Sequence, residues 1–219
     1  MNVLILGASG MVGQGVLREC LLDEGVKRVV TLGRTPTGQT HPKLRDIVQR
    51  DLMNLAPIED QLRGIDACFY CLGASATGLN EAEYTRINYE ITLAVAETLA
   101  RLDPDLTFVY VSGTGTDSTE RGRVMWARVK GRTENALLRL PFKAAYMLRP
   151  GVIIPMHGVK SKTRIYRVFY SVLGPILPLL KSLFPRAVID TEHLGRVMIR
   201  LAGSGYSKNV LEMADLASM

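Results

Sequence analysis

The stretch from Gly7 to Gly13, GASGMVG, has the spacing that points most directly to chemistry. It follows an apolar run, NVLIL, and leads into a helical pattern of apolar residues. A glycine-rich loop between a strand and a helix binds a dinucleotide pyrophosphate, because free N–H groups at a helix start attract anions. Gly10 lets the backbone approach the phosphates, while Gly7 and Gly13 permit a tight turn and close helix packing. We expect nucleotide contacts from Gly7, Ser9, Gly10, Met11, Val12 and Gly13.

The residue after the second apolar run selects between the two nicotinamide dinucleotides. An NAD(H) site usually has an acidic residue about twenty residues after the glycine loop, where it holds the ribose 2′-hydroxyl. Here RVVTLG is followed by Arg34 and by no acidic residue. A guanidinium attracts the 2′-phosphate of NADP(H), which a carboxylate would repel. The sequence therefore favours NADP(H) over NAD(H), with Ser9 as a further hydroxyl partner and a solvated surface arginine as the alternative for Arg34.

Residues after the third and fourth apolar runs are further candidates for cofactor contact. Asp51 and Leu52 follow the third run, where a carboxylate can accept a hydrogen bond from the adenine amino group. Leu72, Gly73 and Ala74 close the fourth. The small residues among them let the ribose and nicotinamide lie against the backbone.

The stretch MWARVK places Lys130 four residues after Trp126. On a helix this spacing puts both side chains on one face, one turn apart. Trp126 is no proton donor for catalysis, since an indole N–H donates a hydrogen bond but does not ionise usefully near neutral pH. Lys130 has two interpretations, a cofactor contact and a surface ion pair with Glu134 at i, i+4.

Alternating strands and helices must position these residues. Apolar runs that predict strands lie near residues 3–6, 28–34, 45–52, 66–73, 106–113, 144–150 and 209–213. The first of them has the pattern of a strand buried on both faces, which is typical of parallel sheets. Helical patterns separate these runs, notably 80–102 with Asn80 as its cap, 125–140 and 191–202. This order predicts an α/β fold, a doubly wound parallel Rossmann sheet, which binds ligands at the carboxyl ends of its strands. Asn88, inside the first of these helices, is either functional or a tolerated surface residue.

Composition limits the classes of function. The 219 residues are 47% apolar and 22% charged, as in ordinary globular proteins, and no linker or repeat divides them, so we expect one NAD(P)-binding domain over residues 1–219. The net charge of +6 suits an anionic ligand, but no basic run or known motif indicates nucleic acid. The histidines are too scattered for a metal site. The apolar segment 169–184 is too short for a membrane span, and no signal-peptide pattern is found, so we expect a cytoplasmic protein.

Cys68 and Cys71 form a C-x-x-C pair, a spacing that can indicate a redox or zinc site. Both fall in a predicted strand, where positions three apart face opposite sides of the sheet. We therefore expect buried, reduced thiols rather than a reactive pair.

In order along the chain, GASGMVG, DL (51–52), CLG (71–73), VSG (111–113), the lysine of WARVK and RPG (149–151) resemble the short-chain dehydrogenase/reductase superfamily. The resemblance covers essentially the whole chain. ARVKGRTE followed by LRPG resembles its atypical or extended branch, the Tat-interacting, oxidoreductase-like proteins grouped with NAD-dependent epimerase/dehydratases. It implies cofactor contacts at Pro150, Gly151 and Val152, and a substrate-covering region within 152–207. His157 there is a weak candidate for substrate contact.

The resemblance also implies catalytic roles. A serine or threonine after the fifth strand polarises the substrate carbonyl, a tyrosine transfers the proton, and a lysine holds the nicotinamide ribose and lowers the tyrosine pKa. Ser112 or Thr114 matches the first role and Lys130 the third, but Trp126 stands at the tyrosine position. General acid catalysis commonly supplies about 10²–10⁴-fold in rate. Candidates for a replacement donor are Tyr84, Tyr89, Tyr110, Tyr166 and Tyr170.

Two functions follow from these residues. One is an NADP(H)-dependent oxidoreductase acting on a small carbonyl substrate without the usual tyrosine. The other is a non-catalytic NADP(H)-binding sensor or regulatory protein that offers a surface to a protein partner. A homodimer is compatible with both. The basic, apolar segment 160–186 is interpreted as a lid, a core helix pair or an oligomer contact, ahead of a membrane-surface role.

Overall fold

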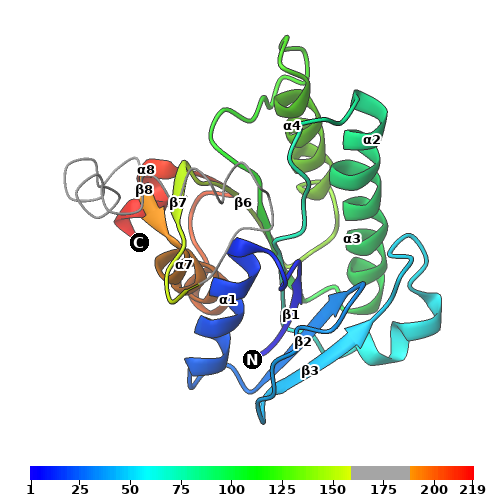
Figure 1. Cartoon of the computed structure of the whole chain (residues 1–219), viewed down its shortest axis with the longest axis vertical. Helices are drawn as coiled ribbons and strands as arrows, with labels where there is room; N and C mark the ends of the chain where they lie inside the picture. The colour runs from blue at the N-terminus through cyan, green and yellow to red at the C-terminus, as the bar shows by residue number, and fades with distance from the viewer. Residues whose placement is uncertain (159–187) are drawn as a thin grey trace.

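The computed structural model describes residues 1–158 and 188–219. A seven-stranded parallel sheet runs in the order β3-β2-β1-β4-β5-β6-β9, with helices on both faces (Figure 1). This confirms the predicted doubly wound Rossmann fold. The strands are β1 (Asn2–Leu6), β2 (Arg28–Gly33), β3 (Leu44–Val48), β4 (Ala67–Tyr70), β5 (Thr107–Val111), β6 (Ala144–Arg149) and β9 (Val210–Glu212).

The helices divide between the two faces of the sheet. Along β1, Val3 and Ile5 pack into one apolar cluster with α1 and α7, while Leu4 and Leu6 pack into another with α3 and the end of α4. The helical elements are α1 (Met11–Leu22), the 3-10 helix η1 (Ala56–Leu62), α2 (Glu81–Thr85), the π-helix η2 (Arg86–Glu90), α3 (Ile91–Leu102), α4 (Met125–Leu137), α7 (Thr191–Ser204) and α8 (Met213–Ser218).

The strand register brings the candidate loops together. Leu6 at the end of β1 pairs with Leu32 on β2 and with Tyr70 on β4. The loops that follow these strands therefore leave the sheet at one level and share its carboxyl edge, where parallel sheets bind ligands.

The helix predicted over 80–102 is three elements, because a π turn separates α2 from α3. Asn80 caps α2 with a capping box, as predicted. Asn88 lies within the π turn and is 1% exposed, so its interpretation as a surface residue is wrong. Its amide donates to the Tyr84 carbonyl (3.1 Å) and accepts from the Ala74 N–H (3.2 Å). Turns of this kind inside helices are frequent at functional sites.

Other boundaries also differ from the predicted ones. The third strand ends at Val48 rather than residue 52, which leaves the following residues in a loop. A two-stranded parallel sheet joins β7 (Val152–Ile154) to β8 (Val188–Asp190), and the sequence did not indicate it. The predicted lid segment 160–186, with its apolar part 169–184, lies outside the described residues. Within 1–158 and 188–219, no helix is long and apolar enough to cross a membrane.

Cys68 and Cys71 face opposite sides of the sheet, as predicted, although β4 ends at Tyr70 and Cys71, which follows it, is only partly buried. Cys68 is buried in the cluster on the α3 face, whereas Cys71 packs against the cluster on the α1 face. Both thiols are free, and burial raises the pKa of each. A thiol held protonated in this way is a poor nucleophile, which agrees with a structural role.

Candidate functional site

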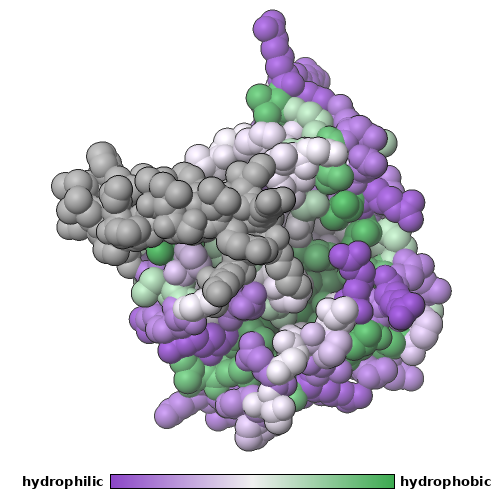
Figure 2. Space-filling model, viewed as in Figure 1, coloured by the Kyte–Doolittle hydropathy of each residue, from purple (hydrophilic) through white to green (hydrophobic). Residues whose placement is uncertain are grey.

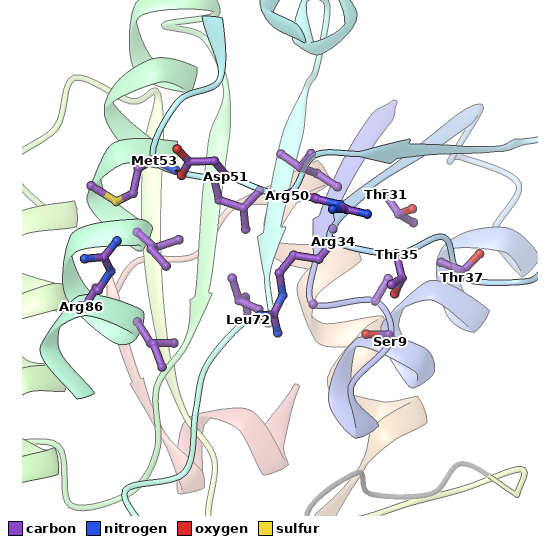
Figure 3. A pocket seen from close by; sticks show the side chains of 17 residues that line it. Ser9, Thr31, Arg34, Thr35, Thr37, Arg50, Asp51, Met53, Leu72 and Arg86 are labelled. Atoms are coloured by element: carbon purple, nitrogen blue, oxygen red, sulfur yellow. Dashed lines mark hydrogen bonds between the residues drawn. The ribbon is translucent and has the colours of Figure 1, made fainter. Parts of the chain in front are cut away.

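A cavity of about 770 Å³ opens at the carboxyl ends of β1, β2 and β3 (Figure 3). Its volume is typical of small-molecule and cofactor sites. In the face shown in Figure 2, apolar residues lie in a hollow surrounded by hydrophilic ones. Of the residues predicted to bind the cofactor, Gly7, Ser9, Arg34, Asp51, Leu52 and Leu72 line the cavity.

The glycine loop has the geometry that its sequence predicts. Gly7 has φ of +78°, and a Cβ there would lie 2.6 Å from the Cys71 backbone, so no larger residue fits. A Cβ at Gly13 would lie 2.1 Å from the Gly7 carbonyl oxygen, which makes this glycine a packing requirement between helix and loop. Gly10 is the N-cap of α1. Gly10, Met11, Val12 and Gly13 are not among the residues lining the cavity; they form the start of the helix behind the loop.

Arg34 and Arg50 bring positive charge to the end of the cavity formed by β2 and β3 (Figure 3). In the described part of the chain, neither guanidinium has a hydrogen-bond or ion-pair partner. The nearby carboxylate of Asp46 is already engaged, since it accepts from the Thr31 hydroxyl and from the Thr37 backbone N–H (2.9 Å). This end of the cavity therefore presents unpaired cations to a ligand.

The loops after β3 and β4 form the opposite side of the cavity. Leu72 lines it, and Asn88 holds the backbone that follows, because its amide oxygen accepts from the Ala74 N–H (3.2 Å). A Cβ at Gly73 would approach the same oxygen to 3.1 Å. Gly73 and Ala74 themselves do not line the cavity. Asp51 is exposed at the cavity, and its carboxylate accepts from the Met53 N–H (3.0 Å) in a local turn.

Several lining residues were missed by the sequence analysis: Ala8, Thr31, Leu32, Gly33, Thr35, Thr37, Arg50, Met53, Arg86, Ile87 and Ile91. Arg50 immediately precedes the predicted Asp51, so its place after a strand was a usable signal. Arg86 and Ile87 lie in the π turn, and the spacing of an uninterrupted helix gave no sign of it.

Lys130 lies at the carboxyl end of β5, away from the cavity. Its Nζ is 3.5 Å from the Val111 carbonyl oxygen and 5.3 Å from the centre of the Tyr110 ring. Burial lowers the pKa of Lys130 to about 8, although the charge of Glu134 acts in the opposite direction. Glu134 is buried and pairs with Arg149 instead, so the interpretation of a surface Lys130–Glu134 pair is wrong.

The hydroxyls expected to polarise a carbonyl already have protein partners. The Ser112 hydroxyl donates to the Glu134 carboxylate and lies 3.0 Å from the Leu148 carbonyl oxygen. The Thr114 hydroxyl donates to the Arg149 carbonyl oxygen (3.0 Å). To donate to a substrate carbonyl, the Ser112 or Thr114 hydroxyl would therefore have to give up its present hydrogen bond to the protein. Thr114 is the more exposed of the two residues.

Trp126 lies in the first turn of α4 and is half-buried. Its indole packs beside Gly115 in the loop after β5, where an added Cβ would lie 3.4 Å from the ring. The indole thus lies next to the loop at the carboxyl edge and not inside the hydrophobic core.

The described tyrosines proposed as replacement donors are badly placed for catalysis. Tyr84 and Tyr110 are 2% and 1% exposed, and burial raises the pKa of Tyr110 well above its usual value. The Arg132 guanidinium lies over the Tyr89 ring, with its carbon 4.1 Å from the centre of that ring. Tyr166 and Tyr170 lie outside the described residues.

Residues after β6 lie beside the β5 loop. The Pro150 carbonyl oxygen accepts from the Thr114 N–H (2.9 Å), while Gly151 and Val152 are exposed. His157 is also exposed, and its ring bonds to the Glu192 carboxylate (2.8 Å). The turn after β6 is therefore near Thr114, on the opposite side of the edge from Arg34.

Comparisons with known proteins give a consistent family. A model of the NAD dependent epimerase/dehydratase family matches residues 3–120. Protein fmp52, mitochondrial, of Emericella nidulans is 29% identical over 192 residues, 83% of this chain and 79% of the relative. HTATIP2 of Rattus norvegicus is 28% identical over 155 residues, 70% of this chain and 63% of the relative.

Solved structures of low sequence identity share the fold. The Bordetella bronchiseptica enzyme WbmF, solved in complex with NAD+, has a TM-score of 0.69 at 16% identity, covering 99% of this chain and 76% of that one. DesIV, a dTDP-glucose 4,6-dehydratase of Streptomyces venezuelae solved with NAD, has a TM-score of 0.71 at 16% identity, covering 97% and 75%.

The names of the fungal relatives correct one expectation. Relatives that span most of the chain are named mitochondrial proteins, among them fmp52 of Emericella nidulans and FMP52 of Debaryomyces hansenii. The expectation of a cytoplasmic protein, which rested on the missing signal-peptide pattern, is wrong on this finding. A signal-peptide pattern tests for secretion only.

Proposed function

The chain belongs to the NAD dependent epimerase/dehydratase family, and from that premise we propose that it binds NADP(H) and acts as an oxidoreductase on a small carbonyl compound. The observation that carries the choice of cofactor is the pair Arg34 and Arg50, which project into the cavity without protein partners among the described residues. A 2′-phosphate supplies the anion that such a pair lacks.

The residues present fit a dinucleotide laid across the carboxyl edge. The cavity at β2 and β3 would take the adenosine half, with Arg34 and Arg50 to hold the 2′-phosphate and Leu52 and Leu72 as apolar contacts. The glycine loop would hold the pyrophosphate, since the N-terminus of α1 offers N–H groups there. Because β4 and β5 follow β1 in the sheet, Lys130 would then be on the nicotinamide side.

The chemistry of a bound nicotinamide dinucleotide is hydride transfer, and the protein's task is to place the substrate and manage the proton. Lys130 has an amine whose pKa near 8 lets it hold or release a proton at neutral pH. Thr114 is exposed and can exchange its bond to the Arg149 carbonyl oxygen for one to a substrate oxygen. Trp126 can donate a hydrogen bond but no proton.

A second candidate function is favoured by Trp126 and by the engaged hydroxyls of Ser112 and Thr114. It is a non-catalytic NADP(H)-binding protein, whose bound cofactor stabilises a surface for a regulatory partner. Both functions predict binding of NADP(H), but only the first predicts turnover.

Steady-state NADPH oxidation against a panel of small aldehydes and ketones separates the two. The oxidoreductase is expected to consume NADPH with at least one of them, and Lys130→Met should abolish this activity while NADPH binding persists. Binding of NADPH with no oxidation above the buffer rate across the panel would favour the non-catalytic protein.

A further inference from the structure

Trp126 is the single tryptophan of the chain, and the proposed function leaves its role open. A half-buried indole beside the loop after β5, at the carboxyl edge of a parallel sheet, is well placed to contact a ligand. Lys130, one helical turn further, marks the same face of α4. The indole lies next to Gly115, after β5, whereas Arg34 and Arg50 follow β2 and β3 at the other end of the edge.

This separation decides which half of a dinucleotide the indole can meet. If the adenosine half fills the cavity and the pyrophosphate lies at the glycine loop, the remaining ring must point towards β5. We infer that the Trp126 indole contacts the nicotinamide ring, and that this contact raises the affinity for the oxidised dinucleotide. A variant with an aliphatic side chain at position 126 should therefore bind the oxidised dinucleotide less tightly than the natural protein does. The inference rests on the proposed NADP(H) site.

The physical basis is the charge of the nicotinamide ring. The oxidised ring is a cation and the reduced ring is neutral. The face of an indole attracts a cation more strongly than any other aromatic side chain does, and at a partly exposed site this is worth about a two- to five-fold change in affinity. The Lys130 ammonium acts in the opposite direction, but it stays in place when Trp126 is replaced. The change between variants therefore isolates the indole.

Fluorescence of the single tryptophan tests the contact without any turnover. NADP⁺ and 2′,5′-ADP share the 2′-phosphate and adenosine, and only NADP⁺ carries the nicotinamide. With both ligands at saturation, as set by calorimetry, NADP⁺ should quench Trp126 emission strongly and 2′,5′-ADP should quench it little. Equal quenching by the two bound ligands would overturn the inference.

Calorimetry of variants tests the preference for the oxidised ring. Trp126→Leu should lower the affinity for NADP⁺ relative to NADPH by about two- to five-fold. Trp126→Phe should have a smaller effect, and the control Leu138→Ala, exposed beyond the end of α4, should have none. An unchanged NADP⁺ to NADPH ratio in Trp126→Leu would also overturn the inference. Failure of the natural protein to bind any of these ligands would refute the proposed NADP(H) site itself, and the inference with it.

Discussion

Lys130 and Trp126 decide what the site can do at the scale of single residues. The lysine amine lies partly buried over the Tyr110 ring, and this burial lowers the pKa of Lys130 to about 8. By the resemblance to short-chain dehydrogenases, the indole stands where that superfamily has a phenol, and Tyr84, Tyr89 and Tyr110 are badly placed to replace it. Within residues 1–158 and 188–219, proton transfer in the proposed oxidoreductase would therefore depend on Lys130, or on a substrate that supplies its own acid.

Restoring the phenol tests this dependence. Trp126→Tyr places a tyrosine one turn from Lys130, whose positive charge favours the phenolate. We expect the NADPH-dependent reduction of a permissive aldehyde to rise by about tenfold or more, towards the 10²–10⁴-fold that general acids commonly supply. Trp126→Phe, which adds no acid, is the control and should give no such rise. An equal rate in both variants would show that the phenol is not needed.

Lys130 also makes stability depend on pH in a defined direction. Its pKa is lowered from 10.5 to about 8 in the folded protein, so between these values the unfolded chain binds more protons. Its charge therefore opposes folding below about pH 8, and this cost disappears as the pH rises towards 10.5. Lys130→Met should be more stable than the natural protein at pH 7 by on the order of 1 kcal/mol, since partial exposure reduces the effect. Urea unfolding should show the difference shrinking by pH 9.5; a constant difference would contradict the lowered pKa.

At the scale of elements, the features that could be predicted from the sequence are those set by the local spacing of apolar residues and glycines. Strands buried on both faces and the glycine turn followed from short patterns, since each is determined by residues within a few positions. The π turn at 86–90 did not, because Asn88 accepts a hydrogen bond from the Ala74 N–H, in a loop fourteen residues away that folding brings beside the helix. Helical spacing offered Glu134 as an alternative surface partner of Lys130, but Glu134 pairs with the guanidinium of Arg149 on β6 instead.

The glycine loop can be tested as an element. Gly10 has φ of −83° and ψ of 168°, which valine also adopts, but a Cβ would lie 3.2 Å from the Gly7 carbonyl oxygen, so the loop must shift by a few tenths of an ångström. With that adjustment Gly10→Val is expected to fold but to lose NADPH binding by at least tenfold, because its side chain would take the space of the pyrophosphate. Gly203→Ala, where a Cβ meets no atom within 4 Å, is the matched control and should bind normally. A folded Gly10→Val that binds NADPH normally would mean that the ligand lies elsewhere.

At the scale of the whole molecule, the parallel sheet gathers loops that are far apart in the sequence onto one edge. Arg34 was recognisable from its distance to the glycine loop. Arg50 had a usable signal in its place before the predicted Asp51, but its pairing with Arg34 in one cavity depends on how the β2 and β3 loops lie together. The region predicted to cover the substrate, 152–207, includes residues outside the described part. The basic balance of +6 agrees with an anionic ligand, although it does not identify one.

The most direct test of the NADP(H) site is the ratio of the dissociation constants of NADPH and NADH, measured by calorimetry at fixed salt. The account predicts that NADPH binds at least tenfold more tightly, the strength of a charge-assisted hydrogen bond to the 2′-phosphate. Arg34→Ala and Arg50→Ala should each reduce this ratio and leave NADH affinity within about twofold. Arg45→Ala, an exposed arginine of β3 that bonds to Gln61, should leave the ratio unchanged. NADH binding as tightly as NADPH, or more tightly, would contradict the account.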